Sequence, residues 1–344
     1  MNFLKKAIIF VIAPLLFSFS AKADLKVVTT IKPLHSLISS VMEGVGKPSL
    51  IIEGTSNPHT FVFKPSHAQM LEAADIVFWI GEDLEAFMEK PLESLASNAT
   101  KISFMELSSI EKLKFREENI FDDHDDHDGH EDEHEGHDDH DHDGHKEDDH
   151  DDHGHDDHDG HEDEHEGHDD HHGHHHGEFD AHIWLDPSNA IEMVLEISHE
   201  LSEIDPENAA QYEENSNKTI ASLNNLINEI NSSIPKDASY VVFHDAYQYF
   251  ETSFDFPAAG AISLGDATDP SAARIAEIQD RVKDEGINCV LSEPQYNANL
   301  VATVLSGTDA KTGVIDPLGL GLEPGPKLYG DLIRNMGKAL AGCL

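Results

Sequence analysis

Short runs of apolar and β-branched residues alternate with longer amphipathic stretches along most of this chain. In its first half, strands are predicted at 26–31, 49–54, 76–81 and 101–107, and helices at 33–43, 65–75 and 83–96. In its second half, strands are predicted at 240–244, 257–264, 288–294 and 312–316, and helices from 246, at 271–285, at 299–306 and from 327. Repeated β-α units are typical of a parallel sheet covered by helices, so the pattern predicts an α/β fold with two lobes.

Two helical stretches separate the two halves of the pattern. Apolar residues recur at near-helical spacing over 188–203, and Pro206 interrupts that spacing. Residues 207–234 contain neither glycine nor proline and carry an apolar stripe, which predicts one helix about 40 Å long. We therefore expect a first lobe at 24–205, a rigid linking helix at 206–234 and a second lobe at 235–344.

The first 23 residues are typical of a secretory signal peptide. Lys5 and Lys6 precede an apolar run at 7–19, and Ala21-Lys22-Ala23 fits the A-x-A cleavage pattern. The run is short for a membrane span, so an uncleaved membrane anchor is the weaker alternative. We expect an exported, soluble mature chain that begins at Asp24, is monomeric and has no lipid anchor.

Residues 122–177 differ from the rest of the chain in composition. They comprise 20 histidines, 27 acidic residues, Lys146 and eight glycines, and one 15-residue sequence occurs twice, at 126–140 and 157–171. Since nothing apolar is available for a core, we expect a disordered loop. Imidazole and carboxylate groups at H-x-x-H spacing predict weak binding of several divalent ions, whereas a plain acidic spacer would need no imidazole. The candidate weak ligands are His124, His127, His130, His134, His137, His161, His165 and His168.

The formal net charge of −46 excludes some partners and favours others. Such a surface repels nucleic acid and anionic lipid and raises the local concentration of cations, so metal ions are favoured. The two cysteines, Cys289 and Cys343, form an even pair in an exported chain. A disulfide between them is therefore expected, with free thiols as metal ligands the minority interpretation.

Candidate metal ligands follow the predicted strands. In an open parallel sheet, loops beyond the carboxyl ends of the strands converge on a common site. The histidines and acids found there, or directly after the acidic loop, are His59, His182, His244, Glu293 and Asp316. Any one of them could be an ordinary structural residue, and Asp316 could cap a turn before Pro317. Together they predict one ion held between the lobes.

Several motifs, taken in order, carry a family resemblance. NPHTFVFKPSHAQMLEAADIVFWIGEDLEAFMEK, AHIWLDP, VVFHDAYQYFE, LSEPQ and IDPLG surround the acidic histidine loop. This set resembles the zinc-binding periplasmic component (ZnuA type) of ABC metal importers. The resemblance implies a buried metal between two α/β lobes and delivery to an inner-membrane permease. It also implies His59, His182 and His244 as ligands, with Asp316, water or a nearby acid in the fourth position.

The ligand chemistry favours zinc(II) as the bound ion. Three imidazoles and one oxygen suit a tetrahedral zinc site, whereas manganese favours more oxygens. A manganese-type binding protein and a secreted zinc-dependent hydrolase are the alternatives, although the chain has no H-E-x-x-H motif. A third hypothesis is a metal buffer that acts through the loop alone.

Overall fold

The computed structural model describes residues 24–116, 177–234, 239–263, 270–296 and 298–342. The predicted signal peptide, the histidine-rich loop apart from Gly177, and Cys343 lie outside these residues. Apart from these gaps, both predicted lobes fall within the described part of the chain.

The first lobe contains a four-stranded sheet in the order β2-β1-β3-β4. Its strands are β1 (Val27–Thr29), β2 (Ser49–Leu50), β3 (Ile76–Trp79) and β4 (Thr100–Ser103), and every neighbouring pair is parallel. The helices of this part are α1 (Lys32–Val41), α2 (Pro65–Glu72), α3 (Glu82–Glu85) and α4 (Glu89–Ser94). A buried apolar run such as β3 is expected where helices cover both faces of a parallel sheet.

The second lobe repeats this topology with the order β6-β5-β7-β8, again all parallel. Its strands are β5 (Tyr240–His244), β6 (Gly260–Ser263), β7 (Cys289–Ser292) and β8 (Lys311–Val314). Its helices are α7 (Gln248–Phe254), α8 (Ala272–Asp284) and α9 (Ala298–Val304). The predicted two-lobed α/β fold with parallel sheets is confirmed.

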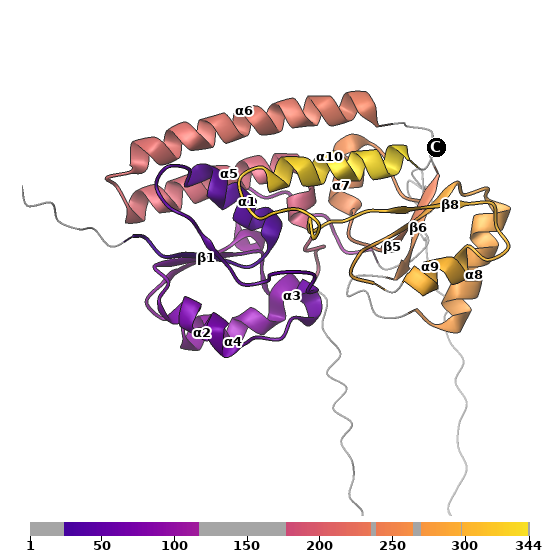
Figure 1. Ribbon diagram of the computed structural model, residues 1–344, viewed down its shortest axis with the longest axis horizontal. Helices are drawn as coiled ribbons and strands as arrows, with labels where there is room; N and C mark the ends of the chain where they lie inside the picture. Colours follow the sequence, from indigo (N-terminus) through magenta and orange to yellow (C-terminus); the bar gives the residue numbers. More distant parts are fainter. Residues whose placement is uncertain (1–23, 117–176, 235–238, 264–269, 297, 343–344) are drawn as a thin grey trace, which may run out of the picture. The chain divides into compact units, whose positions relative to one another are not determined.

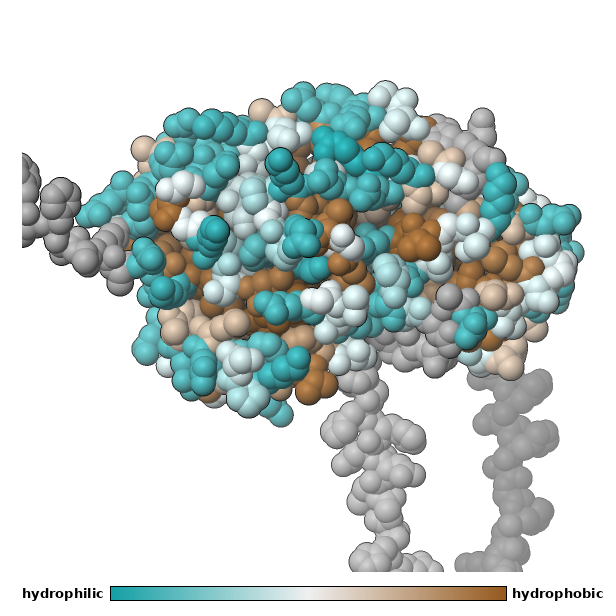
Figure 2. All heavy atoms as spheres, in the orientation of Figure 1, coloured by the Kyte–Doolittle hydropathy of each residue, from teal (hydrophilic) through white to brown (hydrophobic). Residues whose placement is uncertain are grey.

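Helix α6 (Ala209–Ser233) is the predicted linking helix, and its 25 residues span about 37 Å. It packs against α1, against α5 (Pro187–Ile204) and against the C-terminal helix α10 (Leu328–Ala341) (Figure 1). Its buried stripe includes Leu223, Leu226 and Ile230, while hydrophilic side chains cover the outer face above it in Figure 2. One hydrophobic core continues from the first sheet through these helices to β5 and β7. This shared core joins the two lobes.

Several predicted elements are shorter than expected, including β2, which was predicted at 49–54 and is observed at Ser49–Leu50. The stretch at 83–96 is divided into α3, a 3-10 turn at Ala86–Met88 and α4. Pro91 has no N–H to donate to the carbonyl of Phe87, which disfavours a continuous helix across this stretch. Strand β4 ends at Ser103, where a 3-10 turn (Phe104–Glu106) replaces the predicted continuation to 107.

Two further features of the helices concern burial and membrane spans. His67 on α2 is only 7% exposed, and its Nδ1 accepts a hydrogen bond from the backbone N–H of Lys64 at 3.1 Å. The neighbouring rings of Phe61 and Phe63 bury it. Among the helices of the described ranges, none is both long and apolar enough to cross a membrane.

Candidate metal centre

His59 lies on a short 3-10 turn (Pro58–Thr60) that follows the first lobe's edge strand β2. The side-chain oxygen of Asn57 accepts the backbone N–H of His59 at 2.9 Å, which caps the turn. Pro58 at the first helical position sets the backbone angle that the turn requires. The motif Asn-Pro-His thus fixes the backbone of His59, while its side chain stays half-buried.

His182 precedes another 3-10 turn (Ile183–Leu185), and the carboxylate of Asp180 makes two contacts with it. One carboxylate oxygen of Asp180 accepts the backbone N–H of His182 at 2.9 Å and lies 2.7 Å from its ring Nδ1. Burial, with a smaller contribution from His244, lowers the pKa of His182 well below its ordinary value, so the ring is neutral near pH 7. A neutral imidazole with a carboxylate behind Nδ1 presents Nε2 as a metal ligand.

His244 is the last residue of β5, at the carboxyl end of a central strand in the second sheet. Its side chain is buried, and its Nδ1 lies 3.3 Å from a carboxylate oxygen of Glu293, which follows β7. The other oxygen of Glu293 accepts a hydrogen bond from the side-chain amide of Gln295 at 2.6 Å. The second lobe therefore also places a buried carboxylate beside the Nδ1 atom of its histidine, although this contact lacks the hydrogen-bond geometry of the His182–Asp180 pair.

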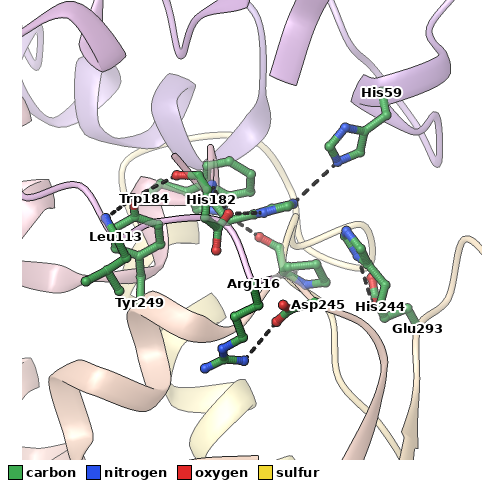
Figure 3. A network of polar contacts seen from close by, with 11 residues as sticks. His59, Leu113, Arg116, His182, Trp184, His244, Asp245, Tyr249 and Glu293 are labelled. Atoms are coloured by element: carbon green, nitrogen blue, oxygen red, sulfur yellow. Dashed lines mark hydrogen bonds and ion pairs between the residues drawn. The ribbon is translucent and has the colours of Figure 1, made fainter. Parts of the chain in front are cut away.

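The three histidines meet between the lobes (Figure 3). One ring nitrogen from each lies within 4.8 Å of the others, and the Nε2 atoms of His59 and His182 are 3.4 Å apart. Two nitrogens bound to one tetrahedral zinc at 2.0–2.1 Å are separated by about 3.3 Å. The His59–His182 separation fits two nitrogen ligands of a single ion, and His244 lies close enough to become the third after a small side-chain adjustment. No other such group of ligands occurs within the described ranges.

The cavity at the three histidines measures about 10 Å³, which corresponds to about one water molecule or ion. Apolar and aromatic groups form much of its wall, and they restrict water around the site. The indole N–H of Trp184 donates to the carbonyl of Pro317 at 2.8 Å, so this wall joins segments that are far apart in the sequence. Besides the histidines, the lining residues are Asn57, Pro58, Trp184, Gln295, Tyr296, Pro317 and Leu318.

Asp316, the predicted fourth ligand, lies outside the group formed by the histidines. Its two carboxylate oxygens accept the backbone N–H groups of Leu318 at 3.0 Å and Leu320 at 2.6 Å. These contacts match the turn-capping alternative, and a role for Asp316 as a ligand stays a prediction. The candidate ligands of the acidic loop lie outside the described residues.

Sequence reasoning named Glu293 but missed other polar residues beside the histidines. Asp180 offered a weak signal, since it stands two residues before His182. Arg116 offered none: its guanidinium contacts Asp245 at 2.9 Å and Glu251 at 2.6 Å, across more than 120 residues of sequence. Burial raises the pKa of Asp245 to about 7 against the opposing effect of Arg116. These charged groups lie beside His244 rather than in the ligand set.

Two parallel-sheet lobes joined by a long helix, with three histidines converging between them, define a two-lobed metal-binding protein. Residues 27–343 match the family model described as zinc-uptake complex component A, periplasmic (ZnuA). The chain belongs to the ZnuA family of periplasmic zinc-uptake components. It is a binding protein and not an enzyme, so the hydrolase alternative is set aside.

Curated relatives agree with this family along nearly the whole chain. The high-affinity zinc uptake system protein ZnuA of Brucella abortus (strain 2308) is 47% identical over 320 residues, covering 92% of this chain and 91% of the relative. That of Paracoccus denitrificans is 37% identical over 328 residues, covering 94% and 93%. A solved structure of a zinc-bound ZnuA deletion mutant has a TM-score of 0.68 at 18% identity, covering 93% of this chain and 98% of that chain, which shows the shared fold.

Proposed function

We propose that this chain captures one zinc(II) ion between its lobes through His59, His182 and His244. The observation that carries the proposal is the convergence of three imidazole nitrogens within 4.8 Å at a cavity of ionic size. Nitrogen ligands suit zinc, and the curated relatives from Brucella and Paracoccus are named for zinc uptake. A water molecule or Asp316 supplies the fourth ligand.

The bound ion is cargo for transport. The mature, monomeric protein collects zinc in the periplasm and delivers it to an inner-membrane ABC permease, as the family's role as a zinc-uptake component supports. The histidine-rich loop at 122–177 binds further ions weakly and collects or buffers them near the central site. Cleavage after Ala23 releases the mature chain.

Metal content and chelator competition test this function directly. The mature protein, purified without chelators, is expected to retain zinc and to compete for it against a chelator of known affinity. Manganese in the same titration should bind far more weakly, because the site offers three nitrogens and few oxygens. Tight manganese binding with weak zinc binding would support the manganese-type alternative instead.

Exchanging one nitrogen for a carboxylate should shift the metal preference. In His244→Glu, we expect zinc affinity to fall more than manganese affinity, since the site becomes richer in oxygen. Competition titrations of both metals with the parent and the variant measure the change in the ratio of the two affinities. An unchanged ratio would show that His244 does not contact the ion.

The two buried carboxylates should contribute to zinc affinity without binding the ion. Asp180→Asn should leave the imidazole of His182 less well oriented and less basic, and Glu293→Gln should do the same to His244. Zinc affinity should therefore fall by about 10–100-fold in each variant. Matched controls are Asp331→Asn and Glu229→Gln, whose side chains are about half exposed on α10 and α6. If both core variants bind zinc as tightly as these controls, the carboxylates do not support the ligands.

A disulfide between Cys289 and Cys343 is also proposed. Cys289 is fully buried at the start of β7, and a bond to Cys343 would tie this strand to the end of the chain. Closing a loop of about 55 residues stabilises a chain by about 4 kcal/mol in the chain-entropy model. Denatured, non-reduced mature protein should therefore resist alkylation at both cysteines. Labelling of both thiols would contradict the pairing.

A further inference from the structure

The segment that carries His182 is paired with the segment that enters the histidine-rich loop. The N–H of Phe115 donates to the carbonyl of Glu178 at 3.1 Å, and that of Asp180 donates to the carbonyl of Leu113 at 2.9 Å. An antiparallel bridge between Lys114 and Phe179 completes a short ladder. The ladder ends at Asp180, whose carboxylate contacts the ring of His182. Displacing residues 113–116 would therefore displace a candidate ligand.

Arg116 extends this ladder into the second lobe. One guanidinium nitrogen contacts Asp245 at 2.9 Å and the other contacts Glu251 at 2.6 Å. Both carboxylates are 2% exposed, while the arginine side chain is 20% exposed. Asp245 directly follows His244, and its N–H donates to the carbonyl of Ser263 at 3.0 Å. The guanidinium is thus ion-paired to the turn that begins at His244.

Tyr249 makes a second connection between the ladder and the second lobe. Its hydroxyl accepts the N–H of Leu113 at 3.0 Å and donates to the carbonyl of Asp180 at 2.7 Å. Tyr249 and Glu251 both lie on α7, the helix that follows the Asp245 turn. Figure 3 shows Arg116, Asp245 and Tyr249 on one side of the histidines. The ladder is held to the second lobe by charge and by hydrogen bonds.

His59 reaches the site from a different part of the chain. It comes from the turn after β2 and meets the Nε2 atom of His182, whereas the contacts of Arg116 and Tyr249 described above involve the segments that carry His182 and His244. Its ring is half-buried, whereas His182 and His244 are 4% and 2% exposed. The centroids of those two buried rings are also the closest of the three pairs, at 4.9 Å against 5.4 and 5.7 Å.

We propose that Arg116 is a positioning residue of the zinc site, which holds His182 and His244 as a preformed pair to which His59 adds the third nitrogen. This inference rests on the proposed function. A planar guanidinium has two fixed donor directions, so it can hold the carboxylates of Asp245 and Glu251 in place at the same time, which a lysine ammonium cannot do. Arg116 acts on the ion only through the two ligands that it positions.

The test is a double-mutant cycle on the full mature chain, read by zinc competition and by the visible spectrum of bound cobalt(II). Arg116→Lys should weaken zinc by about 10-fold and shift the cobalt bands, because ligand geometry changes while charge is kept. The same substitution should lower zinc affinity by about 10-fold in a His59→Ala background. In a His244→Ala background, where the pair of His182 and His244 is already lost, it should lower zinc affinity by less than about threefold. The control is Arg334→Lys, whose half-exposed partner Glu229 lies on α6.

Equal costs in the two histidine backgrounds would overturn the proposal, as would a lower melting temperature with unchanged zinc affinity and cobalt spectrum. If Arg116→Lys does not fold, Glu251→Gln takes its place in the same cycle, because it removes the charge of one of the two acceptors of Arg116. The same two results would then overturn the proposal. Absence of a tight zinc site in the parent chain would instead count against the proposed function. The failures of the two proposals are therefore distinguishable.

Discussion

Replacing His244 by alanine is expected to weaken zinc binding by more than about 100-fold, beyond the range seen when only a supporting residue is lost. His244 ends β5 and is the candidate histidine ligand from the second lobe. Without it, two imidazoles remain, and zinc loses much of its chelate advantage. The histidine is buried against Glu293, so its removal also leaves that carboxylate without the imidazole it faces. Chelator competition with the loop-deleted protein measures the change.

The melting temperature provides a second measurement of the same change. Zinc at 100 times its dissociation constant stabilises the folded parent by about 2.7 kcal/mol, and this gain should nearly vanish in the variant. His199→Ala is the matched control, because His199 is 60% exposed on α5 and its nearest acid is Glu203 at 3.6 Å. Parent-like zinc affinity in His244→Ala would exclude His244 from the ligand set.

Deleting residues 122–177 should leave one tight zinc site and remove several weaker ones. The loop contains 20 of the 26 histidines, whereas His59, His182 and His244 belong to ordered turns and strands outside it. The deletion should also be compatible with folding. Residues 113–115 and 178–180 already lie antiparallel, so the six residues 116–121 would join the two strands as a short hairpin connection.

Isothermal titration of the parent and the deletion variant separates the two classes of site. We expect the tight isotherm to persist with a stoichiometry of one and the weak, multi-ion phase to disappear. A folded deletion variant without the tight phase would place the principal site in the loop and support the buffer hypothesis. A variant that retains every weak ion would exclude the loop as their location.

The sequence predicted the two sheets because both obey simple rules. Buried apolar strands alternate with amphipathic helices, and a helix without glycine or proline continues until its pattern ends, as α6 does. His59 and His244 were singled out because loops at the carboxyl ends of parallel strands converge, whereas His182 was noted directly after the acidic loop, and the set of three ligands followed from the family resemblance. Residues close to a strand end, such as His59 and His244, therefore carry positional information in the sequence itself.

The supporting residues depend on pairings that no local pattern contains. Arg116 meets Asp245 across 129 residues, and Tyr249 meets Asp180 across 69. Their side chains become partners only once the ladder and α7 are packed together. The burial of His67 likewise depends on Phe61 and Phe63, which precede its helix in the sequence, so the helical pattern alone does not reveal it. Tertiary packing, rather than periodicity, decides such positions.

X-ray absorption at the zinc edge tests the central site most directly. The loop-deleted protein would be loaded with one equivalent of zinc, so that only the tight site contributes. The account predicts three imidazole nitrogens at about 2.0–2.1 Å and one oxygen at about 2.0–2.2 Å. A shell with fewer than three imidazoles, or one dominated by oxygen or sulfur, would contradict zinc binding by His59, His182 and His244.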